Sequence, residues 1–400
     1  MPIGPNILAQ SRLPLTFEVI NPGEIGIEPP ENRIGDSLRT WVRSLSVFQK
    51  EAIVASSRTG LVWRLASDEG PYLDGHDEAS CPLSFLTVGM IASYMNEIMA
   101  LAKQQELVIR QIRLIQDNYN TMEGSMRKRT MVGGALPVEL TVEIDCDLDD
   151  AALNALLLNA VAASPINGLM RGKLESLFAL SKNSCQIELG KSKPIEGLLY
   201  GDPENKFDGY EAKGSVLNEP IVEPVGVTPK KEIPGGTSAA GSSLADEQSR
   251  TLNIGGICAL REDGIKEITQ LQYSPHGTSF KLLSEEAEVN GGQGRAPDAN
   301  TYISAGVAFC FMTQFGRFVK MLDLDLKEYR VVQDSYFSLG GASGGTGQAG
   351  TAHPLETHVY LETNESDDVA REMLDISEQT CFLHAFCRTD MKTKLRVVRL

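Results

Sequence analysis

An internal repeat at one constant offset in residue number is the feature that most constrains the fold of this chain. Residues 63–69 match residues 280–286 one by one, without a gap. The same offset pairs further residues: Gly75 with Gly292, Gly89 with Gly306, Met95 with Met312, and Arg171 with Arg388. Solenoid units are only about 20–50 residues long, so a repeat of this length indicates a duplicated domain.

The two copies differ at a pair of chemically important positions. Ser93 in the first copy corresponds to Cys310 in the second, and Ser164 corresponds to Cys381. The same length of chain separates the members of each pair. Only the second copy therefore retains a pair of thiols.

The bulk composition fits a globular chain of two ordinary domains. The chain has 400 residues, of which 42% are hydrophobic and 22% are charged. A formal net charge of −16 argues against a nucleic-acid partner, because binding to phosphates requires clustered Lys and Arg. The simplest interpretation of this net charge is that it keeps the protein soluble.

Targeting and metal signals are missing from the sequence. No apolar run reaches the roughly 18 residues that a membrane-spanning helix needs, and residues 1–5 do not resemble a signal peptide, so we expect a cytoplasmic location and no membrane partner. Seven scattered cysteines, without a CxxC motif, do not form a secreted disulfide framework or a zinc site. We therefore expect no metal and no cofactor, and any disulfide would be transient and catalytic.

Both copies contain the same order of predicted elements, namely strands, a long helix, strands, a second helix and a final strand. This order predicts an α+β domain with a helix layer on an antiparallel sheet. In the first copy we expect strands at 49–56, 61–66, 107–118, 136–144 and 185–189, and helices at 82–103 and 151–163. In the second copy we expect strands at 267–273, 278–283, 327–335, 356–362 and 394–398, and helices at 298–321 and 366–379. We divide the chain into an N-terminal arm (1–40), a first domain (41–195), a Pro/Gly/Ser-rich linker (196–252) and a second domain (253–400).

The thiols are the residues best suited to chemistry. Cys310 lies in the middle of a predicted helix, where a lowered pKa would require a nearby cation. On residue type alone, a buried and inert cysteine is the commoner outcome. His384 follows Cys381 by about one helical turn and could share a face with it. A lone histidine is more often structural than catalytic.

The spacing of these residues resembles the OsmC/Ohr family (osmotically inducible protein C and organic hydroperoxide resistance proteins). The run Ser67-Asp68-Glu69-Gly70-Pro71, then Gly75, Pro82-Leu83 and Ser93, is similar to the family core, as is its counterpart that ends in Cys310-Phe311. The interval from Pro82 to Ser93 matches the family's spacing, and Ser164-Pro165 occupies the place of the family's Cys-Pro pair. The resemblance covers about 60–190 and 277–400.

This resemblance implies a thiol peroxidase for organic hydroperoxides. Cys310 would be peroxidatic and Cys381 resolving, with a dithiol reductant as partner. Family members are intertwined dimers, so two tandem OsmC-like domains would form an intramolecular pseudo-dimer. In this pseudo-dimer the first copy would supply a positively charged side chain, such as Arg43, Arg58 or Arg64, to the site of the second copy. The residues expected to bind a small hydrophobic substrate are Arg295, Asn300 and Phe311, and Arg317 is a further candidate to activate Cys310.

The chain departs from the family pattern near the first cysteine. The family's glutamate before that cysteine is replaced by Asn300, and Cys381 precedes Phe rather than Pro. Two alternatives stay open for this reason. One is a cysteine-dependent hydrolase or lyase in which Cys310 is the nucleophile and His384 the base. The other is a non-catalytic binding protein.

Overall fold

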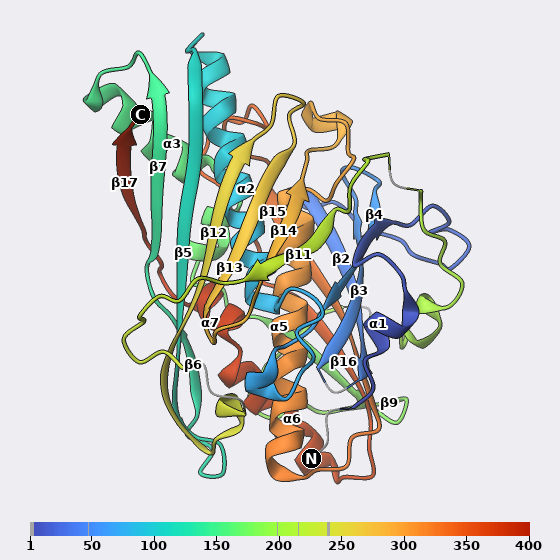
Figure 1. The fold of residues 1–400 in the computed structure, drawn as a ribbon. Coiled ribbons are helices and arrows are strands. Elements are labelled where there is room, and N and C mark those ends of the chain that lie inside the picture. The colour runs from blue at the N-terminus through green and yellow to red at the C-terminus, as the bar shows by residue number, and fades with distance from the viewer. Residues whose placement is uncertain (1–3, 47, 198, 215, 238–240) are drawn as a thin grey trace.

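The computed structural model describes residues 1–400 except 1–3, 47, 198, 215 and 238–240. The start of the predicted arm and residues 238–240 of the predicted linker therefore lie outside the described residues. Two large sheets enclose a pair of long helices, α2 (Pro82–Gln104) and α5 (Ala299–Leu322) (Figure 1). The fold is mixed α+β, as the order of predicted elements indicated.

Each sheet combines strands from both halves of the chain. The first sheet has the order β1 (Thr16–Glu18), β4 (Val62–Ser67), β3 (Gln49–Ser56), β2 (Gly35–Ser46), β15 (Glu328–Ser338), β16 (Glu356–Glu362), β8 (Leu177–Lys182) and β10 (Lys193–Pro194), with β9 (Cys185–Ile187) beside β8. The second has the order β11 (Val222–Val227), β14 (Thr278–Ser284), β13 (Lys266–Ser274), β12 (Glu247–Leu260), β5 (Ile109–Ser125), β7 (Val138–Cys146) and β17 (Thr393–Arg399), with β6 (Val132–Ala135) beside β5. The central pairs β2–β15 and β12–β5 are antiparallel and join one half to the other.

Equivalent helices in the two halves are separated by the offset of the repeat. α2 begins at Pro82 and α5 at Ala299. The second helix of each half is α3 (Asp150–Ala163) or α6 (Asp367–Thr380), followed by a short one, α4 (Ile166–Arg171) or α7 (Phe382–Arg388). The short N-terminal helix α1 (Ile7–Ser11) has no such counterpart among the described residues. Each half therefore supplies one set of elements, and the two sets are interleaved.

The long helices cross at close range because both carry a glycine at the contact. α2 packs on the second sheet, α5 packs on the first, and the two helices pack on each other (Figure 1). A Cβ at Gly89 would lie 2.7 Å from the carbonyl oxygen of Ala299, and a Cβ at Gly306 would lie 2.9 Å from the backbone nitrogen of Leu86. The repeat thus retains a glycine in both copies where the two backbones approach.

α2 corrects the expectation that no segment is apolar enough to span a membrane: its length and composition would suffice, but 78% of the relevant window is buried inside the protein. It is the core helix of the second sheet, and its buried face includes Phe85, Met90 and Tyr94. Its apolar character is therefore accounted for by internal packing.

All the predicted strands and long helices have observed counterparts, but seven observed strands were not predicted: β1, β2, β6, β8, β10, β11 and β12. β2 begins at Gly35, inside the predicted arm, and β12 begins at Glu247, inside the predicted linker. Their first residues are mainly polar and do not alternate, so they resemble loop sequence. β8, which lies before the predicted strand at 185–189, is parallel to β16. The predicted arm also contains α1, and the predicted linker contains β11.

Candidate functional site

The two thiols of the second half lie in contact in the interior. The Sγ atoms of Cys310 and Cys381 are 3.4 Å apart, and the two residues are 2% and 0% exposed. A disulfide has a bond length of about 2.0 Å, so only a small movement separates this contact from a covalent bond. The structure thus brings together the two cysteines that the repeat singled out.

Cys310 is positioned by the long helix α5. The helix begins where the Asp298 side chain accepts a hydrogen bond from the backbone nitrogen of Thr301 at 2.7 Å, which satisfies one of the free amides of the first turn. Cys310 follows about three turns later, one turn after Gly306 at the helix crossing. The close approach of α2 and α5 therefore holds the peptide that carries this thiol.

Cys381 occupies the break between α6 and α7. Its backbone is extended (φ −71°, ψ 118°), so α6 ends at Thr380 and α7 begins at Phe382. Strand β6 of the first half covers this break: a Cβ at Gly133 would lie 2.5 Å from the carbonyl oxygen of Thr380. The Gln379 side-chain amide also donates to the carbonyl oxygen of Met131, at 2.7 Å. The first half thus helps to hold the second thiol in place.

A pocket adjoins Cys310 and is built from both halves. Its polar lining comes from Glu69, Cys81, Ser243, Arg250, Thr313, Gln314 and Arg317, and its apolar lining from Leu73, Leu83, Leu252, Ile254 and Phe382, among others. Arg250 lies on β12, whereas Thr313, Gln314 and Arg317 follow Cys310 along α5. The cavity is small, with about 30 Å³ of space, enough for one or two water molecules, so a larger ligand would require the surrounding side chains to move.

Two arginines of this pocket are buried without a carboxylate partner in the part of the chain that the structure describes. Arg317 is 1% exposed and donates to the carbonyl oxygen of Ser243 at 2.8 Å and to Gln314 Oε1 at 3.2 Å. Arg250 is 6% exposed, donates to Ser243 Oγ and has no partner for its Nε. Burial lowers the pKa of Arg317 to about 9, with a smaller effect from Arg250, and lowers the pKa of Arg250 to about 10. Both guanidinium groups therefore stay positive at neutral pH.

The carboxylate in the pocket, Glu69, belongs to a separate buried network. Its Oε1 accepts from Thr313 Oγ1 at 2.7 Å, and its Oε2 accepts from the Tyr72 hydroxyl at 2.6 Å. Lys50 donates to Thr313 Oγ1 at 2.9 Å and is fully buried. Burial lowers the pKa of Lys50, against the opposing effect of Glu69. This network fixes Thr313 about one turn beyond Cys310.

The resting state of Cys310 is the neutral thiol. Burial raises its pKa well above the ordinary value, and the contact with Cys381 adds to this effect. A nucleophilic thiolate therefore needs added positive charge or access to solvent.

His384 lies beside the thiols in an aromatic cluster. Its ring stacks on Phe311, with centroids 5.0 Å apart, and lies 5.6 Å from the ring of Phe178. Neither ring nitrogen has a hydrogen-bond partner among the described residues. Burial lowers the pKa of His384 to about 3, so its imidazole is neutral and a very weak base.

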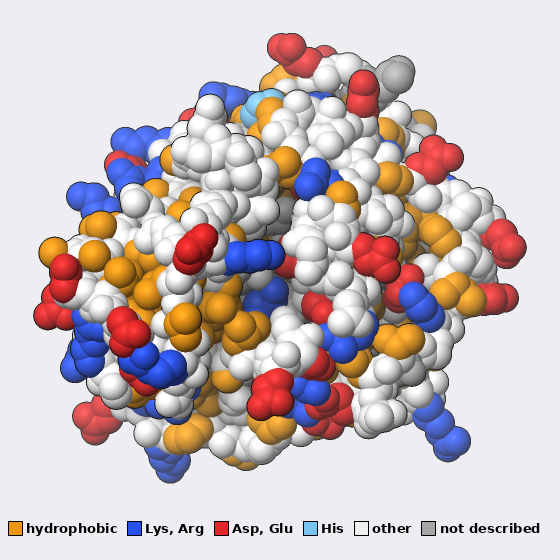
Figure 2. Space-filling model, turned by 90° about the horizontal axis from the view of Figure 1, so that it is seen from above, with side chains coloured by type: hydrophobic (Ala, Val, Ile, Leu, Met, Phe, Trp, Pro, Cys, Tyr) orange, Lys and Arg blue, Asp and Glu red, His pale blue; other side chains and the backbone are white. Residues whose placement is uncertain are grey.

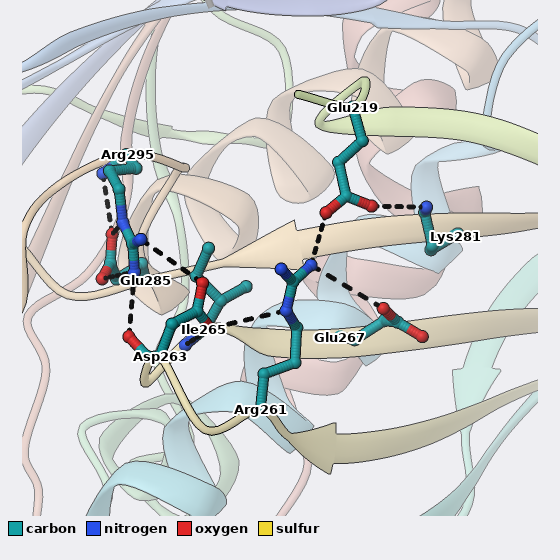
Figure 3. A network of polar contacts seen from close by, with 8 residues as sticks. All are labelled: Glu219, Arg261, Asp263, Ile265, Glu267, Lys281, Glu285 and Arg295. Carbon is teal, nitrogen blue, oxygen red and sulfur yellow. Dashed lines mark hydrogen bonds and ion pairs between the residues drawn. The ribbon is translucent and has the colours of Figure 1, made fainter. Parts of the chain in front are cut away.

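The structure does not bring two of the predicted substrate-binding residues to the Cys310 pocket. Arg295 lies in a polar network at the surface (Figure 3), where its guanidinium donates to Glu285 at 2.7 Å and to the carbonyl oxygen of Asp263 at 2.9 Å. Asn300 lies in the first turn of α5 and donates to Asp36 at 3.2 Å. Both precede Cys310 by more than two helical turns, which places them at the other end of the helix. Phe311 is buried next to Cys310, but it packs in the aromatic cluster.

The first-half arginines that were expected to supply a positive charge to Cys310 form their contacts away from the Cys310 pocket. Arg43 and Arg64 form ion pairs with Glu51 at 2.7 and 2.8 Å. Arg58 donates to Asn290 at 2.8 Å. Arg317, named from its place about two turns after Cys310, does line the pocket. The contribution of Arg250 was missed, because residues 196–252 were interpreted as linker.

The serine pair has its own site near the other end of α5. Ser93 Oγ and Ser164 Oγ are 2.6 Å apart. Asp36, Arg58, Glu97, Glu286 and Asn300 are among the residues that line the adjoining pocket. A wider cleft continues from it along the C-terminal part of α2, and a hollow is visible on this face in the view from above (Figure 2). Ala100 lines this cleft at the repeat position of Arg317, so the serine site has neither the thiols nor that cation.

The comparisons with known proteins point to the second half of the chain. The family model described as "OsmC-like protein" matches residues 292–396. These residues form an OsmC-like domain. The OsmC-like segment contains Cys310, Cys381 and His384, whereas Glu69 and Arg250 of the same pocket lie outside it.

Similarity to individual proteins is weaker. A solved structure of an OsmC-like hydroperoxide resistance protein from Jannaschia sp. CCS1 is 20% identical, with a TM-score of 0.21; the match covers 32% of this chain and 79% of that one. No curated protein matches the chain. Among the described residues, no group of three or more His, Cys, Asp or Glu side chains is arranged to hold a metal ion.

Proposed function

We propose that this chain is an OsmC-like thiol peroxidase that reduces organic hydroperoxides through Cys310 and Cys381. The observation that carries the proposal is the 3.4 Å contact between two buried sulfur atoms beside a pocket with two cationic side chains. Sulfurs at this distance suit an attacking thiol and a resolving thiol that alternate between dithiol and disulfide.

We further propose that the two halves are tandem OsmC-like domains arranged as an intramolecular pseudo-dimer. The constant offset between equivalent helices supports this arrangement, as does the pairing of β2 with β15 and of β12 with β5. In this arrangement the first half supplies Glu69, Cys81 and Leu83 to the pocket of the second-half thiol. The serine pair is then the redox-inactive counterpart.

The reaction begins when Cys310 loses its proton and its thiolate attacks the distal oxygen of the hydroperoxide. The O–O bond breaks, the sulfur gains the hydroxyl oxygen as a sulfenic acid, and the alkoxide takes a proton and leaves as an alcohol. In the proposed reaction, the positive charges of Arg317 and Arg250 favour both the thiolate and the developing alkoxide. They act against burial and the charge of Glu69, both of which raise the pKa of Cys310.

Cys381 completes the oxidative half of the cycle. Its sulfur attacks the sulfenic sulfur of Cys310, a disulfide forms, and water leaves. A dithiol reductant then restores both thiols by exchange and is itself oxidised to a disulfide. Such a reductant fits the expected cytoplasmic location.

The hydrolase alternative gains no support from His384. With a pKa of about 3, its imidazole is too weak a base to activate a nucleophile near neutral pH, and it does not line the Cys310 pocket.

The test is a count of free thiols before and after one equivalent of cumene hydroperoxide. The chain has seven cysteines, and we expect the wild type to lose two, with a disulfide between Cys310 and Cys381 found by peptide mass mapping. Cys310→Ser should lose none, and Cys381→Ser should accumulate a sulfenic acid that dimedone traps. Cys185→Ser, at an exposed cysteine, is the matched control and should behave as the wild type. Retention of all thiols in the wild type would refute the proposal.

A further inference from the structure

We infer that the pocket beside Ser93 and Ser164 is a second ligand-binding site and that it accepts a small amino alcohol. The ammonium group of this ligand contacts buried carboxylates, and its hydroxyl group contacts the serine pair. The pocket shares no lining residue with the Cys310 pocket. Binding at this site therefore goes beyond the proposed peroxidase and does not depend on its thiol chemistry.

The polar network beside Glu69 has a counterpart at the serine pair. Asn96 lies at the repeat position of Thr313 and donates to Glu286 Oε1 at 2.6 Å. Thr313 makes the same contact with Glu69, at 2.7 Å. A lysine completes each network, and at the serine pair Lys266 donates to Asn96 Oδ1. The serine half therefore retains the polar frame of a site although both thiols are lost.

The inner wall of this pocket is more polar than that of the thiol pocket. Three lining positions correspond at the repeat offset: Leu73 to Asn290, Leu83 to Asn300, and Gln314 to Glu97. A hydrocarbon group would leave these polar side chains without partners, so the group that enters the inner pocket should itself be polar.

Two carboxylates of this pocket are buried without an ion pair in the part of the chain that the structure describes. Asp36 is 3% exposed and accepts a hydrogen bond from Ser56 Oγ at 2.8 Å. Glu97 is 1% exposed and accepts from Ser343 Oγ and, at 2.8 Å, from the backbone nitrogen of Ala342. Burial raises the pKa of both carboxyl groups, because the charged form loses its hydration. A bound cation would stabilise that charged form.

The charges around the pocket leave room for one added cation. Asp36, Glu97 and Glu286 line the pocket together with Arg58. Arg58 donates through its Nε to a neutral side chain, at 2.8 Å. Lys266 lies 3.9 Å from Glu286 and offsets the charge of that carboxylate. Because the carboxylates outnumber the two cations by one, a ligand with a single positive charge is favoured.

The serine pair offers a hydrogen-bond donor to a ligand. Ser93 is 2% exposed, Ser164 is 0% exposed, and their Oγ atoms are 2.6 Å apart. Only one of the two hydroxyl groups can donate in this contact, and neither makes another hydrogen bond with the described residues. The second hydrogen is therefore free, and Ser93 lines the pocket. A buried donor without an acceptor is costly, so an oxygen atom of a ligand would lower the free energy of this site.

The need for both a cation and an acceptor defines the head group of the ligand. An ammonium group cannot accept a hydrogen bond, so the ligand also needs an oxygen atom. A carboxylate oxygen would be repelled by Asp36 and by Glu97, which lies about one turn beyond Ser93 on α2. A hydroxyl group accepts the hydrogen without adding charge. An ammonium and a hydroxyl group on neighbouring carbon atoms therefore fit the pocket.

A wider cleft provides space for the rest of the ligand. The inner pocket has about 40 Å³ of space and the cleft about 690 Å³. The two are continuous, because Asn96 and Ser343 are among the residues that line both. Met95, Met99 and Leu260 give the cleft apolar surface. A short aliphatic chain would bury against this surface while the head group occupies the inner pocket.

Equilibrium binding of three molecules with the same carbon chain tests the site. 2-Amino-1-hexanol carries both groups, 1,2-hexanediol lacks the ammonium group, and 2-aminohexane lacks the hydroxyl group. By titration calorimetry we expect the wild type to bind the amino alcohol at least tenfold more tightly than either analogue, since each analogue lacks one hydrogen-bonding group.

Substitutions in the pocket identify the contacts. Glu97→Gln and Asp36→Asn should each weaken binding of the amino alcohol about tenfold and leave binding of the diol unchanged. Ser93→Ala combined with Ser164→Ala should make the amino alcohol bind no more tightly than 2-aminohexane. Glu247→Gln, at an exposed ion pair with Lys128, is the matched control and should bind as the wild type does.

Equal affinities in the wild type would contradict the assigned ligand class. Equal binding of the amino alcohol and the diol would overturn the cation contact, as would wild-type affinity in both acid variants. Equal binding of the amino alcohol and 2-aminohexane would overturn the serine contact. Should an acid variant fail to fold, Ala100→Arg introduces the arginine that the thiol half has at this position. The added positive charge should weaken binding of the amino alcohol about tenfold, and unchanged affinity would overturn the role of charge.

A thiol variant separates this site from the proposed peroxidase. Cys310→Ser should bind the amino alcohol as tightly as the wild type, because the two pockets have no lining residue in common. Loss of binding in Cys310→Ser would place the ligand in the thiol pocket and overturn the assignment. Binding by a wild type that consumes no hydroperoxide would refute the peroxidase and leave the serine site standing.

Discussion

The crossing of α2 and α5 allows a quantitative test of how the Cys310 thiol is held. A Cβ at Gly306 would lie 2.9 Å from the backbone nitrogen of Leu86 and 3.0 Å from Phe85 Cβ. A Cβ at Gly89 would lie 2.6 Å from Ile303 Cγ1 and 2.7 Å from the carbonyl oxygen of Ala299. Because backbone atoms cannot move away independently, an added methyl group must push the helices apart.

Two opposing effects determine how much each substitution changes the free energy of unfolding. Replacing glycine by alanine inside a helix stabilises it by about 1 kcal/mol, whereas overpacking a close-packed core costs about 1–3 kcal/mol. The contacts at Gly89 are the shorter ones, so we expect the overpacking cost there to reach about 3 kcal/mol. After the gain of about 1 kcal/mol in helix propensity, Gly89→Ala should lower the free energy of unfolding by about 2 kcal/mol. For Gly306→Ala we expect a net loss of about 1 kcal/mol.

Urea unfolding would measure these free energies, and the rate of disulfide formation with hydroperoxide would report on the thiols. We expect Gly306→Ala to slow disulfide formation, because Cys310 lies about one turn further along α5. Ala155→Gly, on the exposed side of α3, measures the helix propensity alone and should cost about 1 kcal/mol. A gain of about 1 kcal/mol in Gly89→Ala would contradict the argument, because propensity would then act without any steric cost.

Two buried titratable groups give further predictions. Burial, together with the nearby charges of Glu286 and Asp36, raises the pKa of Asp298 from 3.8 to about 7. Between these two pH values the Asp298 carboxyl is protonated in the folded state but not in the unfolded state. The stability of the protein should therefore fall as pH rises from about 4 to 7. Asp298→Asn should flatten this part of a stability-versus-pH curve from urea unfolding; an unchanged slope would count against the assignment. Burial lowers the pKa of His384 from 6.5 to about 3, so the unfolded state binds the extra proton and stability should fall as pH drops below about 6.5. His384→Phe should remove that loss and still form the disulfide with hydroperoxide, and loss of the reaction with the fold intact would restore His384 as a base.

The sequence predicted the local elements and the identity of the thiol pair better than the surroundings of that pair. Spacing and the swap of serine for cysteine were enough to single out Cys310 and Cys381. Arg295 was a candidate because it precedes the helix that carries Cys310, and Asn300 because it stands at the position of the family's glutamate. Residues several turns apart on a helix lie far from one another, so neither reaches the Cys310 pocket.

The sequence did not reveal several residues that surround the thiols, because they lie on strands, helices and loops that are distant from the thiols along the chain. Glu69 and Leu83 belong to the first half, and Arg250 belongs to a strand whose polar start resembles a linker. Pairing between distant strands depends on the whole fold, so the sequence of one half does not indicate which half surrounds its thiol. One signal was available: Glu69 and Glu286 are identical at the repeat offset, which marks the position as one that both copies retain.

The mixed composition of the two sheets has a consequence for how the protein is made. β2 gains its inner neighbour only when β15, in the last quarter of the chain, has been synthesised, as the contact between Arg39 and Asp334 illustrates. A nascent first half therefore leaves the ribosome with long unpaired strand edges and an apolar helix, α2, whose packing partner α5 does not yet exist. Such intermediates are slow to fold and prone to aggregate. We expect the isolated first half to require chaperones, and co-expression of the two halves as separate chains to rescue its solubility.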